Sequence, residues 1–172
     1  MNMKMTLMAA VVAFISAGYS PAGAADGIGY GRSQAPAPLE GAWRVSIAPY
    51  VCGTDPRQMI NAPPVVSYLT FGPSGTLSET TSNPRFDPGQ RGPGMGYWYR
   101  TGRTQYRAAF EAFILSNNAA YAKGRQRVEQ DMVFDTDDDS WSSDARVAFY
   151  AGNSPTPVQT PACAFATAVR MY

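Results

Sequence analysis

Residues 41–47 of the chain read GAWRVSI, and this stretch decides the fold. Its large apolar side chains, Trp43, Val45 and Ile47, occur at every second position, with polar residues between them. A period of two places alternate side chains on opposite faces of an extended chain, which is typical of a strand with one buried face. The stretch therefore predicts a half-buried β-strand.

Seven more strand-like runs follow. The connections after the first, third, fifth and seventh runs are long and rich in Pro, Gly and Asn, whereas those after the second, fourth and sixth are hairpin-short. Alternate connections of an up-and-down antiparallel sheet lie at opposite ends. We therefore predict an all-β fold, an eight-stranded up-and-down antiparallel barrel with all long loops around one open end. The predicted strands cover about residues 42–52, 64–71, 76–82, 94–100, 104–115, 124–135, 140–150 and 161–172.

One of these runs also fits a helix. Between Gln105 and Leu115 apolar residues recur at helical spacing, and three alanines favour a helix. We favour a strand because the segment lies between a short turn and another strand. A helix there would leave the barrel one strand short.

The first 25 residues are typical of a signal peptide. A lysine precedes an apolar run that ends at Ala17, and small residues form an A-x-A cleavage site, so we expect cleavage after Ala24 or Ala25. The apolar run is too short to span a bilayer, which needs roughly 20 residues, so we predict no membrane span. The predicted location is secreted or periplasmic.

The remaining chain is long enough for one domain with a real core. Residues 26–38 are small, polar and without periodicity, and we predict a flexible leader there. Residues 39–172 are predicted to form a single β-barrel domain.

Composition excludes several kinds of function. The chain has 14 Lys and Arg against 13 Asp and Glu, a near-neutral balance that predicts no nucleic-acid partner. It has no histidine, which excludes Ser-His and Cys-His nucleophiles, a histidine general base and nearly all catalytic zinc geometries. We predict no cofactor.

A short acidic run has the spacing of a calcium loop but lacks other essential residues. Asp135, Asp137 and Asp139 match the first ligands of such a loop. However, Ser140 and Arg146 stand where the loop needs Gly and Glu. We therefore predict no metal site.

Cys52 and Cys163 are the only cysteines. In an oxidising compartment two cysteines usually form one disulfide, although free thiols and an intermolecular bridge are alternatives. If the two residues face each other across the first and last strands, Val45 lies opposite Arg170. Opposed residues share a face, so Arg170 would point inward.

The two ends of the predicted barrel resemble a known signature. Gly41-x-Trp43 at the start of the first strand, with Arg170 near the end of the last, resembles the lipocalin and wider calycin pattern, in which an arginine packs across the tryptophan at the closed end. The resemblance implies an eight-stranded barrel with a ligand in its mouth, and a structural kernel of Gly41, Trp43 and Arg170. The chain is also similar to small exported bacterial proteins of uncharacterised role. No ligand carries over from either comparison.

Glu79 is the main polar candidate for a ligand site. It is in phase with Leu77, which predicts an inward side chain near the mouth. A carboxylate in an apolar cup could serve as an acid, a base or a polar anchor. A slip of one residue would place it in solvent instead.

Aromatic residues are numerous enough to line a pocket. An eight-stranded barrel has room inside for side chains or for one small molecule, so the same rings also fit a packed core. The rings that we consider as ligand contacts are Trp98, Tyr106, Phe110 and Phe149.

The segment 83–94 combines prolines, which restrict the backbone, with glycines, which permit unusual angles. We predict an ordered loop over the mouth, either a functional lid or a plain structural loop. Its Arg85 and Arg91 could meet an anionic ligand, or pair with Asp87 and solvent.

Three functions follow from these features. The first, which we favour, is an exported barrel that binds a small, largely apolar molecule through its mouth. The second is a protein-binding or inhibitor module of the cell envelope, whose mouth loops grip a protein partner. The third is a histidine-free barrel cyclase or isomerase, in which Glu79 acts with Tyr97 or Tyr106. We expect a binding protein more than an enzyme.

Overall fold

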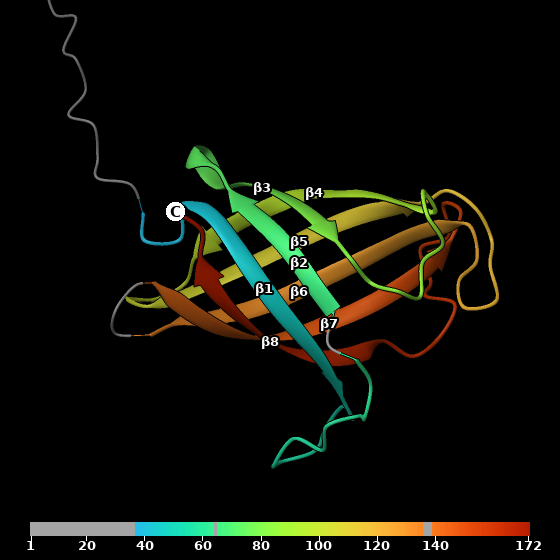
Figure 1. Ribbon diagram of the computed structural model, residues 1–172, viewed down its shortest axis with the longest axis horizontal. Helices are drawn as coiled ribbons and strands as arrows, with labels where there is room; N and C mark the ends of the chain where they lie inside the picture. Colours follow the sequence, from blue (N-terminus) through green and yellow to red (C-terminus); the bar gives the residue numbers. More distant parts are fainter. Residues whose placement is uncertain (1–36, 64, 136–138) are drawn as a thin grey trace, which may run out of the picture. The chain divides into compact units, whose positions relative to one another are not determined.

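The computed structural model describes residues 37–63, 65–135 and 139–172. Each strand in this part pairs with the next in antiparallel fashion, and the last pairs with the first, so the sheet closes into a barrel (Figure 1). This confirms the predicted eight-stranded up-and-down barrel. The strands are β1 (Gly41–Tyr50), β2 (Val65–Phe71), β3 (Thr76–Thr81), β4 (Arg91–Arg100), β5 (Gln105–Ile114), β6 (Gly124–Phe134), β7 (Ser140–Ala151) and β8 (Ala162–Arg170), with one 3₁₀ turn, η1 (Pro73–Gly75).

The two kinds of connection lie at opposite ends of the barrel, as predicted. The tight connections β2–β3 and β4–β5 are on the left in Figure 1, the long connections β3–β4, β5–β6 and β7–β8 are on the right, and the long β1–β2 connection projects at the bottom. The ambiguous segment after Gln105 is strand β5, which pairs along its length with β4 and β6, so the helical alternative is wrong.

Some sequence predictions fall where the structure is not described. The signal peptide, the leader up to residue 36 and Asp137 all lie outside the described residues. The part of the chain that the structure describes contains no helix with the length and apolar character that a membrane span requires.

The seam between β1 and β8 has a different register from the predicted one. Trp43 lies opposite Arg170 and Tyr50 opposite Cys163, so the expected pairing of Val45 with Arg170 is wrong by two residues. The reason is that β1 ends at Tyr50, and Cys52 reaches Cys163 from beyond the strand. A shift of two residues preserves the face, so Arg170 still points inward.

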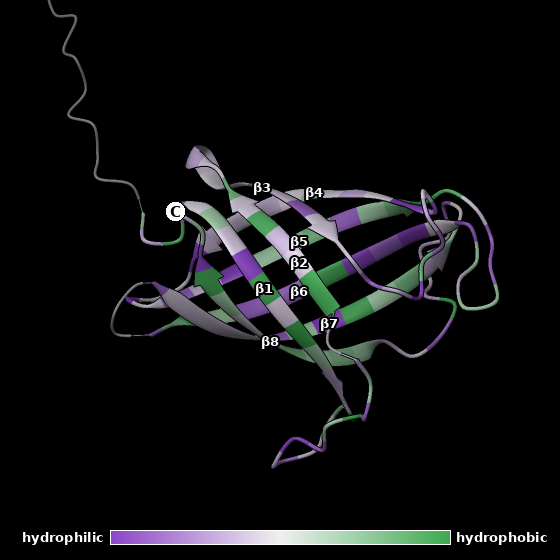
Figure 2. Cartoon of the chain, in the orientation of Figure 1, coloured by the Kyte–Doolittle hydropathy of each residue, from purple (hydrophilic) through white to green (hydrophobic). Residues whose placement is uncertain are grey.

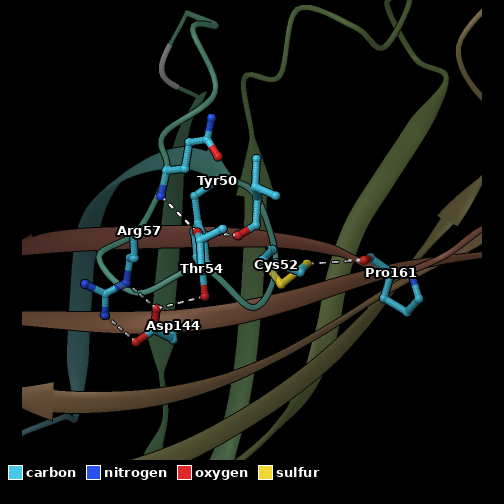
Figure 3. Close-up of a disulfide and its surroundings, with 9 residues drawn as sticks. Tyr50, Cys52, Thr54, Arg57, Asp144 and Pro161 are labelled. Carbon is cyan, nitrogen blue, oxygen red and sulfur yellow. Dashed lines mark hydrogen bonds and ion pairs between the residues drawn. A yellow bond between two sulfur atoms is a disulfide. The ribbon is translucent and has the colours of Figure 1, made fainter.

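The disulfide itself is present. Cys52 and Cys163 are bonded, with Cα atoms 5.2 Å apart. The segment that follows Cys52 contacts the outer wall through Arg57. The Nε and Nη2 atoms of Arg57 donate to the two carboxylate oxygens of Asp144 at 2.8 and 2.6 Å (Figure 3). The hydrogen bond from Arg57 lowers the pKa of Asp144. The β1–β2 connection is therefore held to the barrel wall by a covalent bond and an ion pair.

Arg170 seals the tight-turn end. Its Cζ lies 4.3 Å from the centroid of the Trp43 ring, and its Nη1 donates to the carbonyl of Glu40 at 2.9 Å. Its Nη2 donates to the carbonyl of Pro38. A Cβ atom on Gly41 would lie 3.1 Å from Nη1, so a glycine leaves room for the guanidinium. The contact that the family resemblance implied is thus present.

The chain before β1 completes this seal. Leu39 is fully buried, its carbonyl accepts a hydrogen bond from the Trp43 indole at 2.9 Å, and Ala37 packs against the core. Residues 37 and 38, which we predicted to belong to the leader, therefore form part of the closed end.

A cluster of aromatic rings fills the closed half of the barrel, and we call it the aromatic plug. Neighbouring rings meet edge-on or tilted, with centroids 5.3 to 6.3 Å apart, a favourable geometry for aromatic pairs. Bands of different hydropathy follow one another along the strands (Figure 2), and the burial of every second residue places these rings on the inner face. The plug consists of Trp43, Phe71, Trp98, Tyr106, Phe134 and Trp141.

Replacing Arg170 with Lys is expected to lower the free energy of unfolding by about 1–2 kcal/mol, because lysine keeps the charge but loses the planar, multiply bonded guanidinium. Urea unfolding followed by tryptophan fluorescence measures this. Arg44→Lys, on the exposed face of β1, is the matched control and should change little. Equal losses in both variants would contradict the sealing role.

Removing the disulfide is expected to lower stability much more. The bond closes a loop of sequence separation 111, for which the chain-entropy model gives an upper estimate of about 4–5 kcal/mol. Urea midpoints of the wild type and of the Cys52→Ser/Cys163→Ser variant, each with and without reductant, measure the effect. Reductant should lower the urea midpoint of the wild type and leave that of the variant unchanged. Equal midpoints for the oxidised wild type and the variant would refute the expectation.

Candidate functional site

A cavity of about 710 Å³ occupies the open half of the barrel. The lining residues nearest the closed end are Val45 on β1, Leu69 on β2, Gln130 on β6 and Ala145 on β7. Below the first three lie Trp43 and Phe71 of the aromatic plug and Met132, which packs against it; buried Ser143 lies below Ala145. The cavity is thus a cup whose floor is the plug and whose rim is formed by the long connections.

Small side chains create this space. Three inward positions on β8 and one on β7 carry alanine, and a methyl group cannot reach the barrel axis. The alanines that line the cavity here are Ala145, Ala162, Ala164 and Ala166. The large apolar residues of β8, Phe165 and Val169, lie out of phase with these alanines and face outward.

A buried ion pair lies in the wall of the cup. Glu79 faces inward, as predicted, and its Oε2 lies 2.8 Å from Nη2 of Arg91; both side chains are less than 5% exposed. This contact is electrostatic rather than an aligned hydrogen bond. Ser67 donates to Glu79 Oε1 at 3.2 Å, and Arg91 Nε donates to Gln126 Oε1 at 2.6 Å. The two charges neutralise each other inside the wall.

Arg91 was expected in the mouth loop, where it would pair with Asp87 or solvent. It instead begins β4, three residues earlier than predicted, and pairs with Glu79. The ladder shifts register between Arg91 and Gly94, and such an irregularity accommodates Pro93, which has no N–H to donate. The strand therefore continues past a proline that had indicated a loop.

Gly94 makes room for the carboxylate. A Cβ atom at this position would lie 2.8 Å from Glu79 Oε2 and 2.7 Å from Cδ2 of Phe110. The glycine therefore allows the acidic side chain and the aromatic ring to pack across β4.

Three stacked rings join the mouth connections. Phe86 stacks on Tyr121, and Tyr121 on Phe149, with centroids 4.5 and 4.6 Å apart. Buried Gln90 links the same two loops, because its Oε1 accepts a hydrogen bond from Asn118 Nδ2 at 2.7 Å. The β3–β4 and β5–β6 connections therefore support each other at the rim.

The other candidate residues fall into two groups. Phe110 and Phe149 line the cavity, and exposed Arg85 lies at its rim. Trp98 and Tyr106 belong to the aromatic plug, and the Trp98 indole donates to the carbonyl of Gly72 at 3.0 Å. The geometry thus does not bring these two residues to the cavity.

The residues proposed for a histidine-free enzyme are not brought together. Tyr97 is 53% exposed on the outer face of β4, where it stacks on Tyr99. Tyr106 lies in the plug, and Glu79 is paired with Arg91. Sequence reasoning also missed polar residues that line the cup, above all Gln126 and Gln130, although their alternation with charged neighbours marked them as inward.

Comparison with known proteins gives a distant likeness in fold. No family model and no curated protein matches the chain. Among solved structures, it is similar to EF1p2_mFAP2b bound to DFHBI, with a TM-score of 0.46 and 16% identity over 78% of this chain and 94% of that chain. The barrel assignment here rests on the strand pairing rather than on this likeness.

The Glu79–Arg91 pair can be tested by a mutant cycle. Glu79→Gln or Arg91→Met alone should each lower the free energy of unfolding by about 3–5 kcal/mol, because the remaining charge is buried without its partner. The double variant should lose less than the sum of the two, as measured by urea unfolding. Asp131→Asn, in an exposed pair with Arg107, is the control and should change little. Additive losses would show that the pair does not interact.

Proposed function

We propose that the barrel binds one small, largely apolar molecule inside the cup. The observation that carries this proposal is the cavity itself, which is lined by inward residues of the strands and by residues of the long connections. Cavities of roughly 300–1,000 Å³ are typical of small-molecule sites, and the present one lies within that range.

The lining supports an apolar ligand. Aliphatic and aromatic side chains cover most of the wall, and transfer of apolar surface from water to such a wall is worth roughly 25 cal/mol per Å². Two of the charged lining residues, Glu79 and Arg91, are paired with each other, and the third, exposed Arg85, lies at the rim. Representative apolar lining residues are Val45, Ile47, Leu69, Phe110, Val128 and Val147.

The cavity also favours small-molecule binding over the protein-binding alternative. A module that grips a protein with its mouth loops alone needs no space inside the barrel, and a filled interior would be its expected form. Here alanines leave space between the side chains of the open half, whereas protein interiors are usually closely packed.

The barrel acts outside the reducing cytoplasm in this proposal. The Cys52–Cys163 disulfide supports this location, because such bonds persist mainly in secreted and periplasmic proteins. The predicted signal peptide would provide the route.

Filling the cavity tests the proposal. The neutral, apolar dye N-phenyl-1-naphthylamine should bind the wild type and gain fluorescence. The Ala145→Leu/Ala164→Leu variant should bind it at least about tenfold more weakly, because the added side chains occupy the cup, while its melting temperature stays the same or rises.

Ala148→Leu is the matched control. Ala148 lies on β7 but faces outward, opposite Arg127, and dye binding should be unchanged. The proposal fails if a panel of neutral apolar dyes leaves the wild type unbound, or if the filled variant binds as tightly as the wild type.

A further inference from the structure

We propose that the ligand carries a neutral oxygen acceptor, such as a ketone carbonyl, at the end that enters the cup first, and that this oxygen accepts a hydrogen bond from Nε2 of Gln130. The inference rests on the proposed function and specifies its ligand class. It excludes fatty acids and other carboxylates as preferred ligands.

Gln130 is a buried amide at the floor of the cup. It is 5% exposed and is the deepest residue of β6 that lines the cavity. Ser143 donates to its Oε1 at 3.3 Å, which orients the amide. Its Nε2 has no hydrogen-bond partner among the described residues. A buried donor without a partner costs stability, so a group that supplies an acceptor gains affinity there.

Small residues flank Gln130 where it lines the cavity. Its cross-strand neighbours are Ala108 on β5 and Ala145 on β7, both buried and both small. Below it lies Met132, which packs with the plug and does not line the cavity. A carbonyl oxygen that reaches the floor would therefore meet the amide beside two methyl groups and the Ser143 hydroxyl.

Charge in the cup argues against an anionic group. The Arg91 guanidinium already donates to Gln126 and to the carbonyl of Gly92, and its Nη2 faces Glu79. An added carboxylate would leave one uncompensated negative charge in an apolar cavity that already contains Glu79. Burial of an unpaired charge is strongly unfavourable, so the polar group must be neutral.

The rim sets the orientation of the ligand. The stacked rings of Phe86, Tyr121 and Phe149 border the entrance, and Ile60 and Pro63 lie on its other side. These apolar contacts suit the tail of the molecule. The oxygen therefore goes to the floor and the hydrocarbon faces the mouth.

A matched ligand series tests this inference. An alkane, a methyl ketone and a carboxylic acid of one medium chain length are used to displace N-phenyl-1-naphthylamine at pH 7. The ketone should bind about 3- to 10-fold more tightly than the alkane, the effect of one net hydrogen bond. It should also bind at least about tenfold more tightly than the carboxylate.

Gln130→Met removes the donor at similar volume, and the advantage of the ketone over the alkane should disappear. Gln105→Met makes the same chemical change at an exposed position of β5 and should keep that advantage. A carboxylate that binds as tightly as the ketone, or a retained ketone advantage in Gln130→Met, would overturn the inference. If all three compounds bind equally well, cavity binding stands and only the inference fails; if none binds, both fail.

Infrared spectroscopy gives a second readout that needs no variant. A hydrogen bond to the carbonyl lowers its stretching frequency relative to the same ketone in an alkane solvent. The ketone bound to the wild type should show that lowering. A frequency equal to that in alkane would overturn the inference even if Gln130→Met fails to fold.

Discussion

The hydrogen-bonded seam between β1 and β8 is the contact on which the rest of this structure depends. It removes the two free edges that an open eight-stranded sheet would expose, and it turns one face of every strand inward. Closure also gathers the long connections at one end. Without the seam there would be neither an interior nor a rim.

The two halves of the interior are filled differently. Six aromatic rings and the Arg170–Trp43 contact fill the closed half, where large side chains meet in favourable geometry. Alanines on β7 and β8 leave space between the side chains of the open half. The same barrel can therefore tolerate space at one end because the other end is densely packed.

Much of this was predictable from the sequence, because period-two patterns and loop lengths respond directly to closure. The strands and the inward direction of Glu79 followed from them. The disulfide followed instead from the presence of only two cysteines, and the Trp43–Arg170 contact was implied by the family resemblance. The register of the β1–β8 seam did not follow from these patterns, because Cys52 lies beyond the end of β1. Arg91 was misplaced because Pro93 indicated a loop where the ladder continues past an irregularity. The cavity was not predictable because it depends on small residues, whose alternation leaves little trace in hydropathy.

The rim of the cup is fastened unequally around its circumference. The β1–β2 side carries a covalent bond and the Arg57–Asp144 pair, whereas the opposite side is held by stacked rings and the Gln90 amide. Freeing the β1–β2 side requires reduction of the disulfide, whereas the contacts of the opposite side are all non-covalent. The two sides of the rim therefore differ in kind, one crosslinked by sulfur and the other held by non-covalent contacts alone.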